Sequence, residues 1–247
     1  MRKQILQPVK AMQAAAIFGL SMVFAATAAA DYEEVREFKL DTRGIDLLNI
    51  DAGAGSLEVV GMSGSSEILV TATIRVPGRS ESKARDKIAS DMILTLEKDS
   101  DTARLRSYFD GNGWGFGGSP TISLDVRMPE GMHLVIDDGS GSIDITNVRG
   151  DISVDDGSGS LNMQDVGGNV AVEDGSGTIT IRGVGGDLEI DDGSGTIDIR
   201  GVAGSVVIDD GSGSIDVSDV TEDLIIVDDG SGGVDYANIG GRVQTDD

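Results

Sequence analysis

A tetrapeptide, Asp-Gly-Ser-Gly, recurs through the second half of the chain at an almost constant interval. Its aspartates are Asp138, Asp156, Asp174, Asp192, Asp210 and Asp229, so the successive spacings are 18, 18, 18, 18 and 19 residues. A fixed period of this kind is typical of folds in which each repeat stacks on its neighbours, because one repeat alone cannot bury its apolar face. We assign the one extra residue of the last spacing to the segment Val220–Asp223.

Each repeat contains two segments in which aliphatic and polar residues alternate, the pattern of a β-strand with one buried face. The first segment places inward Leu134/Ile136, Ile152/Val154, Val170/Val172, Leu188/Ile190, Val206/Ile208 and Ile225/Val227. The second places inward Ile143/Ile145, Leu161/Met163, Ile179/Ile181, Ile197/Ile199, Ile215/Val217 and Val234/Tyr236. A third inward series consists of Val148, Val166, Val184, Val202, Val220 and Ile239.

The fixed period and fixed inward positions predict an all-β fold, a parallel β-solenoid of about six 18-residue coils over residues 134–247. Parallel stacking would set successive coils about 4.8 Å apart, with like residues above like. The alternative is an antiparallel meander or barrel with 18-residue hairpins. That fold would use the same glycine turns but would not require like side chains to recur so regularly.

Residues 31–133 lack the strict period and predict an N-terminal β-rich cap region, one continuous fold with the solenoid. Asn49–Val59 echoes a coil turn, and Ser80–Met92 is the one credible short helix. The expected strands are Ile68–Ile74, Met92–Glu97, Ala103–Tyr108 and Thr121–Met128. Such a cap could cover the first coil against end-to-end pairing.

Residues 1–30 have the three parts of a secretory signal peptide. Three basic residues precede or flank the apolar stretch Ala14–Ala26, and Ala28–Ala30 reads as a cleavage site. The alternative is a membrane anchor, although the apolar stretch is shorter than the roughly 20 residues that a span needs. No second apolar stretch of spanning length follows, so we expect an exported protein, periplasmic or at the cell surface (extracellular), without a membrane span after cleavage.

The chain is strongly acidic, with a net charge of -24. Residues 134–247 hold 25 acidic and only 4 basic residues. This balance excludes a nucleic-acid partner, because binding phosphates needs clustered Lys and Arg. There is no Cys, so disulfides and thiolate metal sites are excluded, and the single histidine, His133, makes His-rich metal centres and most His-based relays unexpected.

Two rows of carboxylates are the strongest chemical feature. The Asp-Gly-Ser-Gly aspartates form one row, and the residues before them form an outer row of Asp137, Asp155, Glu173, Asp191, Asp209 and Asp228. Calcium takes several oxygen ligands, so Ca²⁺ binding along these rows is a hypothesis. The favoured interpretation is structural: the inner aspartates accept hydrogen bonds from turn amides, and the outer ones keep the rod soluble. We assign no metal, cofactor or catalytic residue.

Two further motifs can be interpreted either as structural or as functional. The glycine-rich loop Ser107–Pro120 contains Tyr108, Phe109, Trp114 and Phe116, which could stack on sugars or contact a partner, but packing against the solenoid end or the helix is favoured. Arg149–Asp151 spells Arg-Gly-Asp, which we interpret as a product of the repeat rather than an integrin motif.

No arrangement typical of an enzyme is found. The serines of Asp-Gly-Ser-Gly are copies of a turn residue without a plausible histidine partner, and His133 is a single residue at a strand start. A polysaccharide-active β-helix enzyme remains an alternative, but its carboxylate pair needs distinctive residues in a groove, which a uniform row does not offer. We therefore predict a protein that is not an enzyme.

The chain also resembles a known family. The pattern is an early glycine-turn strand pair, a Ser/Lys/Ala helix, a strand ending in Pro-Glu-Gly (Leu124–Gly131) and then the repeated coils. It is similar to the bacterial putative-adhesin family of exported β-strand-repeat domains of unknown function, over nearly all of residues 40–247. The resemblance implies a surface-interaction role and supplies no catalytic residues.

The expected function is therefore that of an exported adhesin or interaction scaffold in the cell envelope, with an envelope or surface protein or a glycan as partner. Two alternatives stay open. One is a divalent-cation (Ca²⁺) binding envelope protein, and the other is the polysaccharide-active enzyme.

Overall fold

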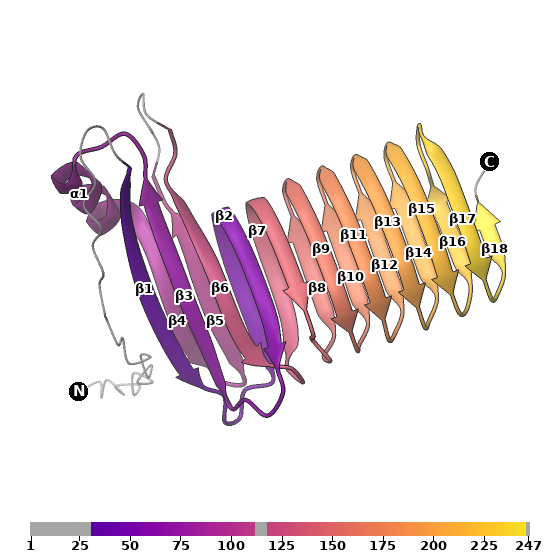
Figure 1. The fold of residues 1–247 in the computed structure, drawn as a ribbon, viewed down its shortest axis with the longest axis horizontal. Coiled ribbons are helices and arrows are strands. Elements are labelled where there is room, and N and C mark those ends of the chain that lie inside the picture. Colours follow the sequence, from indigo (N-terminus) through magenta and orange to yellow (C-terminus); the bar gives the residue numbers. More distant parts are fainter. Residues whose placement is uncertain (1–30, 112–117, 246–247) are drawn as a thin grey trace, which may run out of the picture.

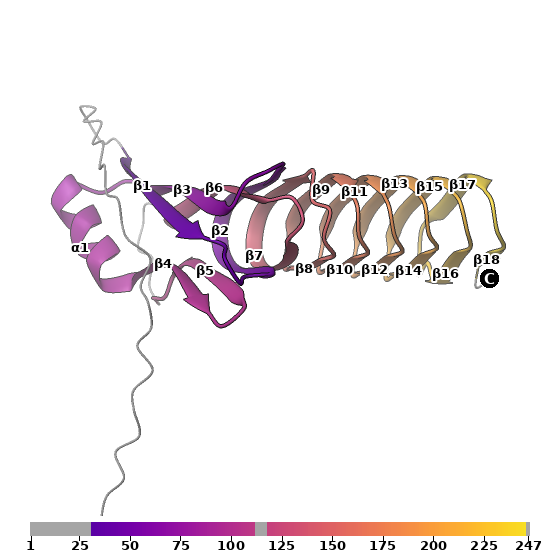
Figure 2. The same ribbon diagram turned by 90° about the horizontal axis from the view of Figure 1, so that it is seen from below.

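The computed structural model describes residues 31–111 and 118–245, and these form an elongated rod built from two facing β-walls (Figures 1 and 2). The expected signal peptide, residues 1–30, lies outside the described residues, as do Trp114 and Phe116. One helix lies at the N-terminal end of the rod (Figure 1). No described helix is long and apolar enough to cross a membrane.

The N-terminal part contains six strands and the helix before the regular coils begin. These are β1 (Tyr32–Asp41), β2 (Leu47–Met62), β3 (Glu67–Val76), α1 (Glu81–Asp91), β4 (Met92–Asp99), β5 (Thr102–Phe109) and β6 (Thr121–Pro129). The coils contain β7 (His133–Thr146), β8 (Ile152–Asp156), β9 (Gly159–Val166), β10 (Val170–Asp174), β11 (Gly177–Val184), β12 (Leu188–Asp192), β13 (Gly195–Val202), β14 (Val206–Asp210), β15 (Gly213–Val220), β16 (Leu224–Asp228), β17 (Gly233–Ile239) and β18 (Val243–Thr245).

The strands form two walls that share the long strands β2 and β7. Wall A runs β4, β5, β2, β7, β8, β10, β12, β14, β16, β18, and wall B runs β1, β3, β6, β2, β7, β9, β11, β13, β15, β17. Figure 2 shows the two walls edge-on, one above the other. From β2 onward every coil pairs with the next in parallel, for example Ile190 with Ile208 and Ile179 with Ile197. The parallel solenoid is confirmed, and the antiparallel meander is wrong for the repeats.

The inward series of the sequence form one continuous core. Ile179, Ile181, Ile197 and Ile199 are fully buried, and the third series is buried from Val148 to Val220. Alternate positions on each strand face solvent, as the pleat requires.

The last coil differs from the prediction in two respects. Tyr236, expected to point inward, is 51% exposed, because β17 pairs only with β15 among the described strands. The first segment of this coil also differs. Leu224 and Ile226 are buried there, whereas Val227 is 46% exposed, so the expected inward pair Ile225/Val227 is wrong. The cause is a β-bulge: Ile208 pairs with Ile226, but Asp209 pairs with Asp228. The extra residue is therefore Val227, not a residue of Val220–Asp223, because a bulge absorbs one residue without shifting the strand that precedes it.

The expected strands and helix of the N-terminal part are confirmed to within two residues at their ends. Ser80 precedes α1 in an extended conformation but makes no side-chain cap hydrogen bond, while Ala84 and Ile88 face the core. The echo at Asn49–Val59 is confirmed as a coil, since Ile50 stacks on Ile136 and Leu57 on Ile143.

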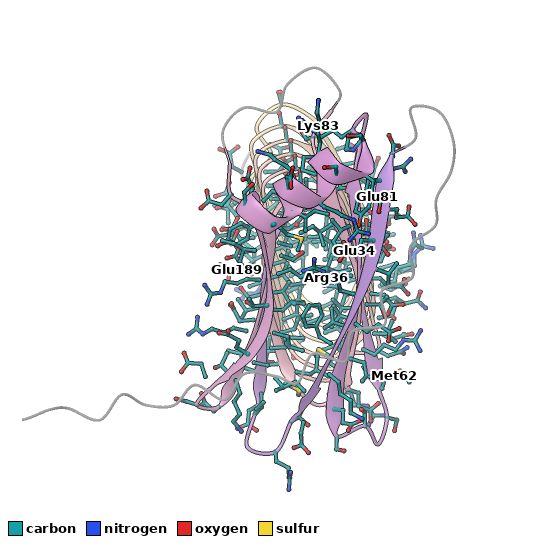
Figure 3. All side chains as sticks on the ribbon, turned by 90° about the vertical axis from the view of Figure 1, so that its left-hand side faces the viewer. Glu34, Arg36, Met62, Glu81, Lys83 and Glu189 are labelled. Carbon is teal, nitrogen blue, oxygen red and sulfur yellow. The ribbon has the colours of Figure 1, made fainter. Side chains whose placement is uncertain are left out.

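Strand β1 was not expected from the sequence, and it covers the N-terminal end of wall B by pairing antiparallel with β3. Its inward side carries a charged pair: Arg36 Nε donates to Glu34 Oε1 at 2.8 Å, and the Tyr32 hydroxyl donates to Glu34 Oε2 at 3.0 Å. Figure 3 views this end and shows Glu34 and Arg36 across the opening between the walls. Inward-pointing charges on an edge strand oppose further strand addition, so β1 closes this end of the sheet.

The second glycine of each Asp-Gly-Ser-Gly turn is required by stacking. A Cβ on Gly195 would overlap the backbone carbonyl oxygen of Gly177 in the coil before, and the same overlap would occur at Gly177 and Gly213. The atoms in the way are backbone atoms, which side-chain rotation cannot move. At Gly233, in contrast, an added Cβ would meet nothing within 4 Å.

We therefore expect Gly195→Ala to lower the free energy of unfolding by about 3 kcal/mol or more, because the added methyl group forces two coils apart. The matched control, Gly233→Ala, should change it by about 0.5 kcal/mol at most. Chemical denaturation followed by circular dichroism measures both. Equal stability of the two variants would contradict close backbone stacking at this corner.

Candidate functional site

The inner aspartates form the turns that the sequence predicts. Oδ1 of Asp156 accepts a hydrogen bond from the backbone N–H of Ser158 at 3.1 Å, and the same bond joins Asp192 to Ser194 at 3.0 Å. The equivalent pairs Asp174–Ser176 and Asp210–Ser212 are bonded at 3.1 and 3.0 Å. In the last coil Asp228 takes this role instead of Asp229, because the bulge has displaced the turn. Asp228 Oδ1 accepts a hydrogen bond from the Gly230 N–H at 2.8 Å.

These aspartates are also buried, which was not predicted from the sequence. Five of them are between 1% and 5% exposed, and their Oδ2 atoms have no hydrogen-bond partner: Asp138, Asp156, Asp174, Asp192 and Asp210. The sequence did contain a signal for this burial: each aspartate lies two residues after an inward aliphatic residue, so its side chain points to the same face of the strand. We call these five stacked carboxyls the buried acidic column.

Burial raises the pKa of every carboxyl in the column, because desolvation disfavours the charged form. The pKa of Asp192 is raised to about 6, although the hydrogen bond from Ser194 acts in the opposite direction. The pKa of Asp138 is raised to about 7, by desolvation first and then by the neighbouring charges of Asp156 and Asp137. The column therefore contains groups that titrate near neutral pH.

The outer carboxylates of wall A are exposed and have no counter-ion. None of the five between β7 and β14 makes a hydrogen bond or ion pair with another described residue: Asp137, Asp155, Glu173, Asp191 and Asp209. Their register pairing places each one directly beside the next. Like charges about 4.8 Å apart repel, so this row is an uncompensated line of negative charge.

Wall B is different because part of its acidic row has basic or amide partners, although Asp216 and Asp235 have none among the described residues. Arg182 Nη2 lies 2.9 Å from Asp198 Oδ2 in the next coil, and Asn162 Nδ2 donates to Asp144 Oδ1 at 3.1 Å. Arg200 also projects from wall B, donating to Ser218 Oγ at 3.2 Å. Of the four basic residues in 134–247, none projects from the outer side of wall A between β7 and β14.

A shallow groove of about 630 Å³ runs along the outside of wall A across five coils. We call it the outer groove. Val135, Ala171 and Val207 line its floor, and Glu189 projects from the same row. Figure 3 shows Glu189 on the outer side of the wall that contains β4 and β5.

One edge of the outer groove is a side-chain ladder that the sequence analysis missed. Asp151 Oδ1 accepts from the backbone N–H of Asn169, Asn169 Oδ1 from Asp187, and Asp187 Oδ1 from Ser205, each at 2.9 Å. His133 begins the ladder, since its Nδ1 accepts from the Asp151 N–H at 3.0 Å. The signal was a polar residue directly before the first inward aliphatic residue of each coil.

The Arg-Gly-Asp motif is part of this corner. Gly150 is buried, and Arg149 Nε lies 3.4 Å from Glu130 Oε2. The Asp151 carboxylate accepts a hydrogen bond within the ladder. In the aromatic loop, Phe109 is partly buried against the core and Tyr108 belongs to β5. Packing of the whole loop over the solenoid end or the helix stays a prediction.

No metal centre is evident in the described parts of the chain: no three of their His, Asp or Glu side chains are grouped so as to hold an ion. The carboxylates of each row lie side by side rather than around a point. The Ca²⁺ hypothesis therefore gains no supporting geometry from residues 31–111 and 118–245.

The raised pKa values predict stability that falls as pH rises. A carboxyl with a raised pKa in the folded state binds more protons folded than unfolded, so its stabilising contribution is present below the unfolded pKa and is lost as pH rises through the folded one. For the column this window runs from the ordinary value of 3.8 to about 6 or 7. The midpoint of thermal unfolding should be higher at pH 5 than at pH 8.

Asp192→Asn tests the column directly, because the amide oxygen can still accept from Ser194 while the buried charge is removed. At pH 8 we expect a gain of on the order of 1–3 kcal/mol in unfolding free energy, and a weaker pH dependence. Asp191→Asn, its exposed neighbour, should change stability by about 0.5 kcal/mol at most. A loss of stability in Asp192→Asn at pH 8 would show that the buried carboxylate is satisfied after all.

Comparisons with known proteins find similar solved structures, of which three are described below. No family model matches the chain, and no curated protein matches it. A putative cell adhesion protein from Clostridium sporogenes is 11% identical with a TM-score of 0.30, over 88% of this chain and 100% of its own. Putative adhesins from Bacteroides fragilis and Parabacteroides distasonis are 12% and 14% identical, each with a TM-score of 0.36, over 86% of this chain and 97% of their own. The names of all three are of the kind that the sequence resemblance implies.

Proposed function

We propose that this protein is an exported, non-enzymatic adhesin or interaction scaffold of the cell envelope, and that wall A is its binding face. The observation that carries the proposal is the uncompensated carboxylate row of wall A, held in register by the backbone ladders of successive coils. A rigid β-sheet presents these charges at a fixed spacing. A binding partner therefore meets a surface that is already organised, which lowers the entropy lost on binding.

The repetition of the chain favours binding over catalysis. A catalytic site needs a few groups with different roles, such as a nucleophile beside a base. Here each candidate group is one of several near-identical copies: the turn serines donate their backbone N–H to the inner aspartates, and the outer carboxylates occupy equivalent register positions. His133, the one histidine, accepts a backbone N–H at the corner.

The proposal can be tested with the full chain purified from its exporting host. Labelled protein should bind isolated envelope fractions in a saturable way, and the affinity should fall as NaCl is raised, because salt screens exposed charges. Neutralising three outer carboxylates of wall A (Asp155→Asn, Asp191→Asn and Asp209→Asn together) should weaken binding by about tenfold or more, which equals roughly 1.4 kcal/mol.

The matched control neutralises three carboxylates of wall B in the same way (Asp144→Asn, Asp216→Asn and Asp235→Asn together). This triple variant has the same net charge, and we expect it to bind almost as tightly as the unaltered chain. If both triple variants lose the same affinity, net charge rather than wall A is responsible. If neither loses affinity, wall A is not the binding face.

A further inference from the structure

The outer groove has the dimensions and the floor of a site for an extended chain. Its floor follows equivalent positions from Val135 on β7 to Val207 on β14, which are separated by four coil steps or about 19 Å. Small or aliphatic side chains occupy most of these positions, so the floor is shallow and partly apolar at Val135, Ala171 and Val207. A long, thin ligand fits this shape better than a compact one.

The charges around the groove select a cationic ligand. Asp151 and Asp187 lie along the corner edge, Glu189 projects from the floor, and the outer carboxylate row runs two residues further along each strand. Asp151 and Asp187 use one oxygen each in the ladder, and the second oxygen of Asp151 lies 3.3 Å from His133 Nδ1. Glu189 has no partner among the described residues. A ligand with an apolar side and regularly spaced positive charges would match both the floor and its surroundings.

The backbone of the wall excludes one common binding mode. Strands β8, β10 and β12 are each paired on both sides, so none has a free edge beneath the groove at which a partner strand could be added. A peptide lying across them must keep its own backbone solvated. The polyproline II conformation does this, since it has no internal hydrogen bonds.

The spacing of that conformation also fits the coils. Polyproline II has three residues per turn and rises about 3.1 Å per residue, or about 9.3 Å per turn. Two coil steps are about 9.6 Å. A basic residue at every third position would therefore follow every second coil without losing register over the length of the groove.

We propose that the outer groove binds a basic peptide segment in the polyproline II conformation, with Lys or Arg at every third position and Pro or small apolar residues between. The inference rests on the proposed function and names the partner class for wall A. The apolar residues lie on the Val135–Val207 floor, and the ammonium or guanidinium groups pair with Asp151, Asp187, Glu189 and the outer row.

The test compares two nine-residue peptides of one composition with the full chain. In the first, (Lys-Pro-Pro)₃, three lysines span about 19 Å in polyproline II; in the second the three lysines are adjacent and six prolines follow. Fluorescence anisotropy should give at least about tenfold tighter binding of the spaced peptide. Equal affinity of the two peptides would overturn the proposed spacing.

Two charge-reversal variants locate the site. Glu189→Lys places a positive charge in the groove and should weaken binding of the spaced peptide by about tenfold or more. Asp216→Lys makes the same change of net charge at an exposed, unpaired position on wall B, and should weaken it by no more than about threefold. An uncharged variant, Ala171→Phe, fills the floor and should also weaken binding. Unchanged melting temperatures show that the three variants fold.

The outcomes separate this inference from the proposed function. If Glu189→Lys and Asp216→Lys weaken binding equally, the attraction is a general charge effect and the groove assignment is wrong. If an amine-bearing polysaccharide such as chitosan binds with the expected variant pattern and neither peptide does, the partner class is wrong although the groove is right. If neither ligand binds while envelope binding still depends on the outer row, the inference fails and the proposed function stands.

Discussion

Every regular coil from β7 onward depends on the backbone hydrogen bonds that join residues 18 positions apart. Because these bonds pair Gly195 with Gly177 and Ile197 with Ile179, each side chain must share its space with the equivalent residue of the neighbouring coils. The corner is the tightest place, since a Cβ at the second turn glycine would overlap a backbone carbonyl of the adjacent coil. The constancy of the 18-residue period follows from this constraint, and the one extra residue, Val227, is absorbed by a bulge.

The same stacking explains why the acidic column both stabilises and destabilises the fold. An aspartate before Gly-Ser-Gly satisfies the turn through Oδ1, and in-register stacking then repeats that carboxyl in every coil. The second oxygen is carried into the interior without a partner, and desolvation raises the pKa of the group. Turn formation and carboxylate burial therefore occur together from Asp156 to Asp210. In Asp156, Asp174, Asp192 and Asp210 the turn hydrogen bond lowers the pKa and so opposes the larger effect of desolvation, which raises it.

The sequence predicted most of the fold because a repeat reports the same interaction many times. Inward positions such as Ile179 and Ile197 were identifiable from period and alternation alone. The last coil was misread because one insertion can be placed at several positions when only spacing is known, and the bulge that selects Val227 is a property of strand pairing. Strand β1 was missed because its inward Glu34 and Arg36 break the alternation, and the Asp151–Asn169 ladder was missed because it connects coils rather than neighbours in sequence.

The acidic residues of the two walls differ in how many basic partners they have, and this difference restricts the possible roles of the negative charge. Charge that served solubility alone would be effective on either wall, and stacking would favour basic partners between coils wherever they fit, as Arg182 and Asp198 show on wall B. Wall A offers the same geometry between Asp155 and its neighbours, yet no basic residue projects there between β7 and β14. Repulsion along this row opposes coil stacking in proportion to the number of coils. A cationic partner lying along wall A would remove that repulsion, so binding and the stability of the solenoid should be coupled through the same row of carboxylates.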